Sequence, residues 1–198
     1  MLKKQYFALN LIILILVTIN LRAPITSIGP IVEIVQKHYQ ISSSEVGLLT
    51  SLPLIAFGIF SFFAMYLQTS LALFIALISI LIGEILRSYG SSFLPSNGAL
   101  FLGTIIIGFG IAIGNVILPI FVKSKFKKHL SKIMSLYSLM INSSGFLGIL
   151  VALPMALMLP IPHALAVWSI ISLMALLAFL PYTKNKRHQK QTKPDDGQ

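Results

Sequence analysis

Apolar runs long enough to cross a membrane recur along the whole chain. A helix needs about 20 predominantly apolar residues to cross a hydrocarbon core of roughly 30 Å. Only 10% of the 198 residues are charged, whereas soluble domains carry about 25%. The sequence therefore predicts an all-α membrane protein in a lipid bilayer, with six transmembrane helices at about 6–34, 44–66, 70–89, 99–121, 130–157 and 164–182.

The basic residues are distributed unevenly between the ends of these spans. With the N-terminus in the cytoplasm, the cytoplasmic segments hold 12 of the 15 lysines and arginines, namely Lys3, Lys4, Lys123, Lys125, Lys127, Lys128, Lys132, Lys184, Lys186, Arg187, Lys190 and Lys193. Positive charge of this kind marks the cytoplasmic side. We expect an integral protein of the bacterial inner membrane with both termini in the cytoplasm. A bundle over residues 1–182 would be followed by a basic, disordered tail over 183–198.

This charge pattern argues against a nucleic-acid partner. The net charge is +10, but the basic residues lie between and after apolar spans and do not form a continuous binding stripe. The lysine cluster from Lys123 to Lys132 fits a role in fixing topology, with contact to anionic lipids as a secondary role.

Local signals define both ends of the second span. Ser42 and Glu45 have the spacing of a capping box, and Ile41 is placed as a hydrophobic staple. The span should therefore begin near Ser42. Residues 45–88 as one helix would run about 66 Å, which is twice a bilayer, so we expect a tight turn at 68–70.

The starts of the second and fifth spans share a pattern. SEVGLLTSLPLIAFG (44–58) and SKIMSLYSLMINSSG (131–145) have Ser, Leu, Ser, Leu and Gly at the same offsets, and the two spans enter the membrane from opposite sides. A 3+3 inverted repeat, as in each half of some transporters, produces this arrangement. Chance matches in a composition rich in Leu, Ser and Gly explain it as well.

Three stretches carry a resemblance to a known family. They are NLRAPITSIGPI (20–31), SSSEVGLLTSLPLIAFGIFS (42–61) and GFGIAIGNVILPIFVKSKFKKHLSKIMSLYS (108–138). They resemble the cyanate permease and nitroimidazole transporter branch of the major facilitator superfamily. The resemblance covers residues 10 to 180 and implies the N-terminal six-helix bundle of a transporter, whose first, fourth and fifth helices line the solute cavity.

The sequence departs from this family in two respects. Family members have about twelve helices in two six-helix halves, and this chain has the length of one half. The family also places a charged loop between the second and third helices, where this chain has only YLQTSL (66–71).

Arg22 is the strongest candidate for a binding residue. It lies near the middle of the first span, where an arginine costs about 2.5–3.5 kcal/mol on insertion scales. Its planar set of donors suits a small anion or a polar solute. Asn20 is its near neighbour, and Thr18 and Thr26 lie four residues either side on the same helical face. The alternatives are that Arg22 pairs with another buried group or snorkels along a tilted helix.

Pro24 predicts a break in the same span. Its ring removes the hydrogen bond to the Asn20 carbonyl and kinks the helix, and transporters place such irregular backbone beside substrate sites. Asn115 in the fourth span and Asn142 in the fifth fall at a similar depth. They could complete a polar cluster with Arg22, or form hydrogen bonds between helices.

Glu84 and Arg87 lie three residues apart near the outer end of the third span. They can pair along one helix face, or Glu84 can carry a coupling proton. Small residues at the spacing of Gly110 and Gly114, and of Ser144 and Gly148, predict surfaces for close helix packing, or for sliding during gating. No cluster of residues suggests a metal or an organic cofactor.

The sequence favours a secondary transporter, or half of one, that moves a small anionic or polar solute by alternating access. Such a half needs a second half-transporter chain or a second copy of itself. The alternatives are a non-transporting truncated remnant and a membrane-embedded binding or scaffold subunit. An enzyme is not expected, because the NSSG stretch (142–145) lacks the first glycine of the rhomboid-type serine motif and His163 lies at a helix end.

Overall fold

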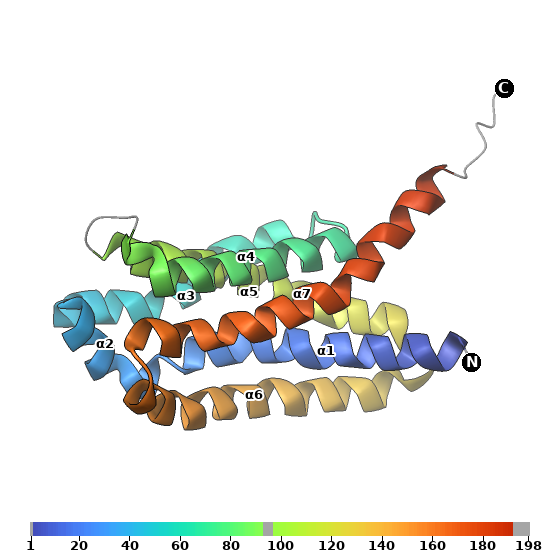
Figure 1. Ribbon diagram of the computed structural model, residues 1–198. Coiled ribbons are helices and arrows are strands. Elements are labelled where there is room, and N and C mark those ends of the chain that lie inside the picture. Colours follow the sequence, from blue (N-terminus) through green and yellow to red (C-terminus); the bar gives the residue numbers. More distant parts are fainter. Residues whose placement is uncertain (1, 93–96, 192–198) are drawn as a thin grey trace.

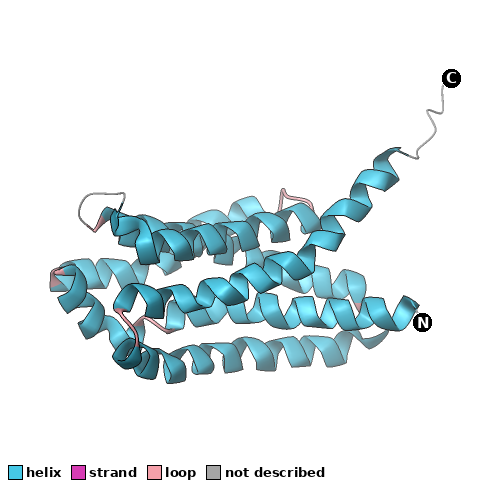
Figure 2. Ribbon diagram, viewed as in Figure 1, coloured by secondary structure: helices cyan, strands magenta, loops and turns pink. Residues whose placement is uncertain are grey.

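The computed structural model describes the backbone of residues 2–92 and 97–191, and the side chains of residues 7–92 and 97–182 (Figure 1). Helices joined by short loops make up these ranges, and no strand occurs in them (Figure 2). The α-helices are α1 (Leu2–Thr26), α2 (Val32–Tyr39), α3 (Ser43–Ala64), α4 (Thr69–Tyr89), α5 (Gly98–Lys125), α6 (Leu130–Met158) and α7 (Ile161–Gln191).

Six segments of the described chain are long and apolar enough to cross a membrane, which confirms the predicted fold class. The first segment combines α1 and α2, and the others correspond to α3 through α7. Their bounds lie close to the predicted spans because long apolar runs are read directly from the sequence.

The helices form a bundle in which α5 has the most covered position. Helix α5 packs against α4, α3 and α1, while α7 bridges α4 and α1, and α6 packs on the far side of α1 (Figure 1). In the most apolar window of each helix, 61% of the residues are buried in α5, against 17% in α3 and 22% in α6. Helices α3 and α6 therefore present the largest apolar surfaces to whatever surrounds this bundle.

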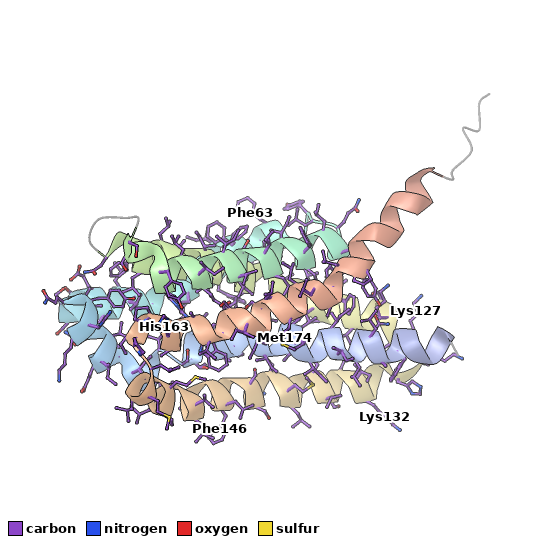
Figure 3. All side chains as sticks on the ribbon, in the orientation of Figure 1. Phe63, Lys127, Lys132, Phe146, His163 and Met174 are labelled. Carbon is purple, nitrogen blue, oxygen red and sulfur yellow. The ribbon has the colours of Figure 1, made fainter. Side chains whose placement is uncertain are left out.

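The two ends of the bundle differ in chemistry. Figure 3 places Lys127 and Lys132 at the end where the chain begins, and His163 at the opposite end. Lys123 and Lys125 lie in the last turn of α5, at the same end as Lys127. The lysines from Lys123 to Lys132 that were predicted to be cytoplasmic therefore share one end of the described bundle.

Small residues sit where helices approach most closely. A Cβ on Gly103 of α5 would lie 2.7 Å from the Gly83 carbonyl oxygen of α4, and a Cβ on Gly110 would lie 2.6 Å from the Ala76 carbonyl oxygen. Gly114 lies against Leu21 of α1. A larger side chain at these positions would push whole helices apart.

On α6, two small residues lie against α1. Ser144 donates a 3.3 Å hydrogen bond to the Thr18 carbonyl. A Cβ on Gly148 would lie 2.8 Å from the Ala23 carbonyl oxygen.

The first span is interrupted later than the sequence predicted. Helix α1 continues through Pro24 and ends at Thr26, and a 3-10 turn (Gly29–Ile31) then leads into α2. Pro30 explains this position, because proline has no N–H and disfavours a helical conformation in the residue before it. The first membrane-spanning segment, Phe7–Tyr39, therefore consists of two helices separated by residues 27–31, and its break lies after Thr26 and not at Pro24.

The start of α3 confirms the predicted capping box. The Glu45 carboxylate accepts from the Ser42 backbone N–H at 2.7 Å, and the Ser42 hydroxyl accepts from the Glu45 N–H at 3.3 Å. Ile41 is buried in a hydrophobic cluster against which Val46 packs, in keeping with a hydrophobic staple. The turn that follows α3 lies at 65–68, slightly before the predicted position, because Thr69 and Ser70 already belong to α4.

Helix α7 extends further than expected. It continues to Gln191, although the sequence was taken to become disordered at Thr183. The segment is rich in Lys, Arg and Gln, which are good helix formers, and no proline follows Pro181 until after the end of the helix. The rest of the predicted tail, residues 192–198, lies outside the described residues.

Candidate functional site

A cavity of about 230 Å³ opens beside Arg22, between α1, α3 and α5. Its polar lining comes from Arg22, Thr26 and Asn115, and its apolar lining from Leu21, Ile25, Pro53, Leu54, Phe57 and Ile111. Helix α1 supplies one wall, the middle of α3 the second, and the middle of α5 the third. A mostly apolar hollow with a few convergent polar groups is the usual form of a small-molecule site.

Arg22 is exposed towards this cavity. Within the described residues, its guanidinium forms no hydrogen bond or ion pair, and it interacts electrostatically with Tyr137 of α6. The predicted alternative in which Arg22 pairs with another buried group therefore has no counterpart in the described part of the chain. The donors of the guanidinium are available for a ligand.

Two of the other predicted residues lie with Arg22. Thr26 donates a 3.0 Å hydrogen bond to the Gly145 carbonyl of α6, which fixes α6 against this part of α1. Asn115 is half-buried and donates a 3.0 Å hydrogen bond to the Ile111 carbonyl of its own helix. Its carbonyl oxygen keeps lone pairs that a solute can use.

The remaining candidates lie elsewhere. Thr18 is fully buried and donates to the Leu14 carbonyl, so it does not share the open face of Arg22. Asn142 is exposed on α6 and donates to the Ser138 carbonyl, but it does not line the cavity. Asn20 is 1% exposed and points into the bundle.

Asn20 belongs to a second polar cluster, which is closed to the surroundings. The Ser172 hydroxyl of α7 lies 2.5 Å from Asn20 Oδ1 and 2.6 Å from Glu84 Oε2 of α4. All three residues are almost completely buried. A hydrogen-bonded chain thus joins α4, α7 and α1 inside the bundle.

Glu84 and Arg87 are both buried, and no hydrogen bond joins their side chains in the described structure. Arg87 Nη1 donates at 3.1 Å to the Pro24 carbonyl of α1, while its Nε and Nη2 atoms and Glu84 Oε1 have no hydrogen-bond partner in the described structure. The sequence placed these residues as a possible pair near the outer end of the third span. The two side chains interact electrostatically, and each also reaches a different neighbouring helix.

Arg87 stabilises the end of α1. The last carbonyl groups of a helix have no partner within the helix and form the negative end of its dipole. The guanidinium supplies a donor and a positive charge at that point, six residues before Pro30. This contact explains why a buried arginine is tolerated, and it holds the segment that carries Arg22 and Thr26.

Ser172 is the residue of this cluster that sequence reasoning missed. It is a single hydroxyl within a long apolar stretch of α7, and a polar residue inside a span is itself a signal for a specific contact. Its partners lie 88 and 152 positions away in the chain, so the sequence offers no local pattern that joins them. The described residues contain no cluster of three or more His, Cys, Asp or Glu that could hold a metal ion.

The described residues thus combine six apolar segments with a mostly apolar cavity that Arg22, Thr26 and Asn115 line on one side of the bundle. The sequence profile of the Major Facilitator Superfamily matches residues 11–198. The chain therefore belongs to the major facilitator superfamily and is an integral membrane protein.

Curated relatives are similar to the chain over much of its length. It is 35% identical to an uncharacterized transporter, YycB, of Bacillus subtilis, over 90% of this chain and 45% of the relative. It is 34% identical to the 2-nitroimidazole transporter of Escherichia coli, over 88% of this chain and 44% of the relative. It is also 27% identical to the cyanate transport protein CynX of Escherichia coli, over 70% of this chain and 36% of the relative.

The chain spans about half the length of the curated relatives that it matches. No solved structure matches it significantly. The relatives are transporters, which are not enzymes.

Proposed function

We propose that this chain forms one half of a secondary transporter that moves a small anionic or polar solute through the bacterial inner membrane by alternating access. The observation that carries the proposal is the exposed Arg22, which has no partner among the described residues and lies in a cavity within a membrane-spanning segment. A charge in that position is expensive unless it faces a polar path or a ligand.

The cavity favours small solutes. Its volume of about 230 Å³ lies below the roughly 300–1,000 Å³ typical of drug-sized ligands. The guanidinium fork can bind an anion through two parallel hydrogen bonds, Asn115 adds an amide, and Leu54 and Phe57 provide apolar contact. Cyanate and 2-nitroimidazole, which name two of the relatives, are solutes of this size.

A second bundle completes the proposed transporter. Alternating access needs two bundles that move around one site. The cavity has α1, α3 and α5 as its walls and is open on its remaining side. We propose that a second six-helix unit, supplied by another chain or by a second copy of this one, covers this side. A non-transporting scaffold would not need an unpaired arginine there.

The basic end of the bundle supports the proposed orientation. The lysines from Lys123 to Lys132 are gathered at the end where α1 begins (Figure 3). The excess of lysine and arginine in cytoplasmic loops supports a cytoplasmic location for this end and for both termini.

Uptake by proteoliposomes tests the role of Arg22. We expect the reconstituted full chain to take up labelled cyanate or 2-nitroimidazole. Arg22→Ala should lower uptake about 10-fold or more, because a hydrogen bond to a charged group contributes about 1.5–3 kcal/mol. Arg22→Lys should insert normally but recover only part of the uptake, since an ammonium lacks the planar fork.

The control is Lys37→Ala, which removes an exposed positive charge from α2, away from the cavity. Uptake by Arg22→Ala equal to that of the wild-type and Lys37→Ala proteins would overturn the role of Arg22. Chemical cross-linking in the same liposomes tests the second bundle: a chain that transports as a strict monomer would contradict it.

A further inference from the structure

If Glu84 were ionised, the contacts of the closed polar cluster would need more hydrogens than its side chains can donate. The Ser172 hydroxyl contacts two oxygens, Asn20 Oδ1 at 2.5 Å and Glu84 Oε2 at 2.6 Å. A hydroxyl has one hydrogen and can donate to only one of them. If Glu84 were a carboxylate, both neighbours would be acceptors only, and one of these short contacts would contain no hydrogen.

The orientation of the Asn20 amide is fixed independently. Its Nδ2 donates a 2.8 Å hydrogen bond to the Leu16 carbonyl. Exchanging the amide oxygen and nitrogen would place Oδ1 against that carbonyl, with two acceptors facing each other, and would lose this bond. Asn20 therefore presents its oxygen to Ser172 and cannot supply the missing hydrogen.

A hydrogen on Glu84 satisfies every contact in the chain. Glu84 Oε2–H then donates to Ser172 Oγ, and Ser172 Oγ–H donates to Asn20 Oδ1. Each hydroxyl acts once as a donor, as buried polar groups require. The nearby Ser88 hydroxyl donates to the backbone carbonyl of Glu84 and not to the carboxyl group.

The charged neighbours do not require an ionised Glu84. Arg87, on the same helix, interacts electrostatically with Glu84, but it directs Nη1 to the Pro24 carbonyl at the negative end of α1 and forms no hydrogen bond with the carboxyl group in the described structure. Tyr39 of α2 interacts electrostatically with Arg87. On α7, His163 lies at the end of the helix and bonds to Tyr89. From α1 the cluster receives only the neutral Asn20, and α5 contributes the neutral glycines that face α4.

We propose that Glu84 is a proton-binding site whose proton state is relayed by Ser172 to Asn20 of α1. Release of the proton to water breaks the Glu84 O–H bond and leaves a carboxylate. Ser172 must then donate its only hydrogen to Glu84, and its bond to Asn20 is lost. Asn20 lies two residues before Arg22, so this step loosens the segment of α1 that forms the solute cavity.

This inference adds a proton site to the proposed transport function, but its test does not depend on transport. Infrared spectroscopy of the purified full chain detects the C=O stretch of a protonated carboxylic acid, which a carboxylate lacks. The assignment is tractable because the chain has only five acidic residues, Glu33, Glu45, Glu84, Asp195 and Asp196. Ordinary carboxyl groups are ionised at pH 7.

We expect the wild-type protein at pH 7 to show a carboxylic-acid band that shifts in D₂O. Glu84→Gln should abolish the band, whereas the matched control Glu33→Gln, on an exposed position of α2, should retain it. In Ser172→Ala the band should persist but move to a higher frequency, because the acid loses its acceptor.

The absence of the band from the wild-type protein would overturn the proposal, as would a band that Glu84→Gln leaves unchanged. The wild-type measurement decides even if a variant fails to fold. A missing band would leave Arg22-dependent uptake intact, and a missing uptake would leave the band intact, so the two proposals fail separately.

Discussion

Asn20 and Arg22 lie two residues apart on α1, yet they occupy opposite environments. Two residues correspond to about 200° of rotation around a helix. Asn20 is therefore turned into the contact with α4 and α7, where the Ser172 hydroxyl lies 2.5 Å away, while Arg22 is turned to the open cavity with α3 and α5. A single polar stretch thus serves a closed cluster on one side and an open site on the other.

The two arginines inside the spans show the same contrast. Arg87 is 1% exposed and donates to the end of α1, whereas Arg22 is exposed and its guanidinium donates to none of the described residues. Both are costly in a membrane; a donor of Arg87 bonds to the end of α1, and we propose that those of Arg22 bind a ligand. Making the same kind of substitution at equivalent residues of the two regions tests this distinction.

The largest expected difference is between Arg87→Leu and Arg22→Leu. Arg87→Leu should lower the free energy of unfolding by about 2–3 kcal/mol, because it removes a buried hydrogen bond from a charged donor and leaves the Pro24 carbonyl with the Ser27 hydroxyl as its side-chain donor. Arg22→Leu should change it by less than about 0.5 kcal/mol, as substitutions at exposed positions usually do. Thermal unfolding in detergent, followed by the fluorescence of the single tryptophan, Trp168, measures both. Equal losses would contradict the division between a structural and a binding arginine.

A smaller difference should separate the two asparagines. Asn20→Ala should lower the free energy of unfolding by about 1–2 kcal/mol, because it leaves the buried Ser172 hydroxyl without its acceptor. Asn115→Ala should leave stability nearly unchanged, since its amide bonds only to its own helix, but should weaken solute uptake several-fold. Unfolding curves and uptake rates of both variants distinguish these two roles. If Asn115→Ala lowered the free energy of unfolding and Asn20→Ala lowered only uptake, Asn115 would be the structural residue.

The smallest expected effect concerns the wall between α1 and α6. Thr26→Val keeps the shape of the side chain and removes the hydroxyl that bonds to the Gly145 carbonyl. Hydrogen bonds between membrane helices average about 0.6 kcal/mol, and we expect a loss of that size in unfolding free energy. Thr50→Val, on an exposed position of α3 with bonds only to its own helix, is the matched control. A loss no larger than that of the control would show that Thr26 does not join the helices.

Much of the architecture could be predicted from the sequence. The number of spans and the capping box at Ser42 and Glu45 depend on residues that are near neighbours in the chain, and both are found in the structure. The errors were local as well. Pro24 was given the break that Pro30 causes, because a proline is tolerated inside α1 while a Gly-Pro pair is not, and a run of good helix formers after Thr183 was taken for disorder.

The candidate site was predicted only in part. Arg22, Thr26 and Asn115 lie together in the cavity, whereas Thr18, Asn20 and Asn142 do not. Spacing along α1 placed Thr18 and Thr26 on one face, but α6 and the other helices cover that face unevenly along its length. The partnership of Glu84 with Ser172 has no signal in the sequence, because it joins two helices that are distant along the chain.

The sequence by itself determined that the chain spans a membrane with six helical segments, since apolar length and local caps act between neighbouring residues. It also marked Arg22 and Glu84 as unusual, since a charge in an apolar run is costly wherever it lies. Only the tertiary structure decided which charge is open and which is enclosed. A helix presents side chains all around its axis, and the packing of α4 and α7 against α1 selects the side that is closed.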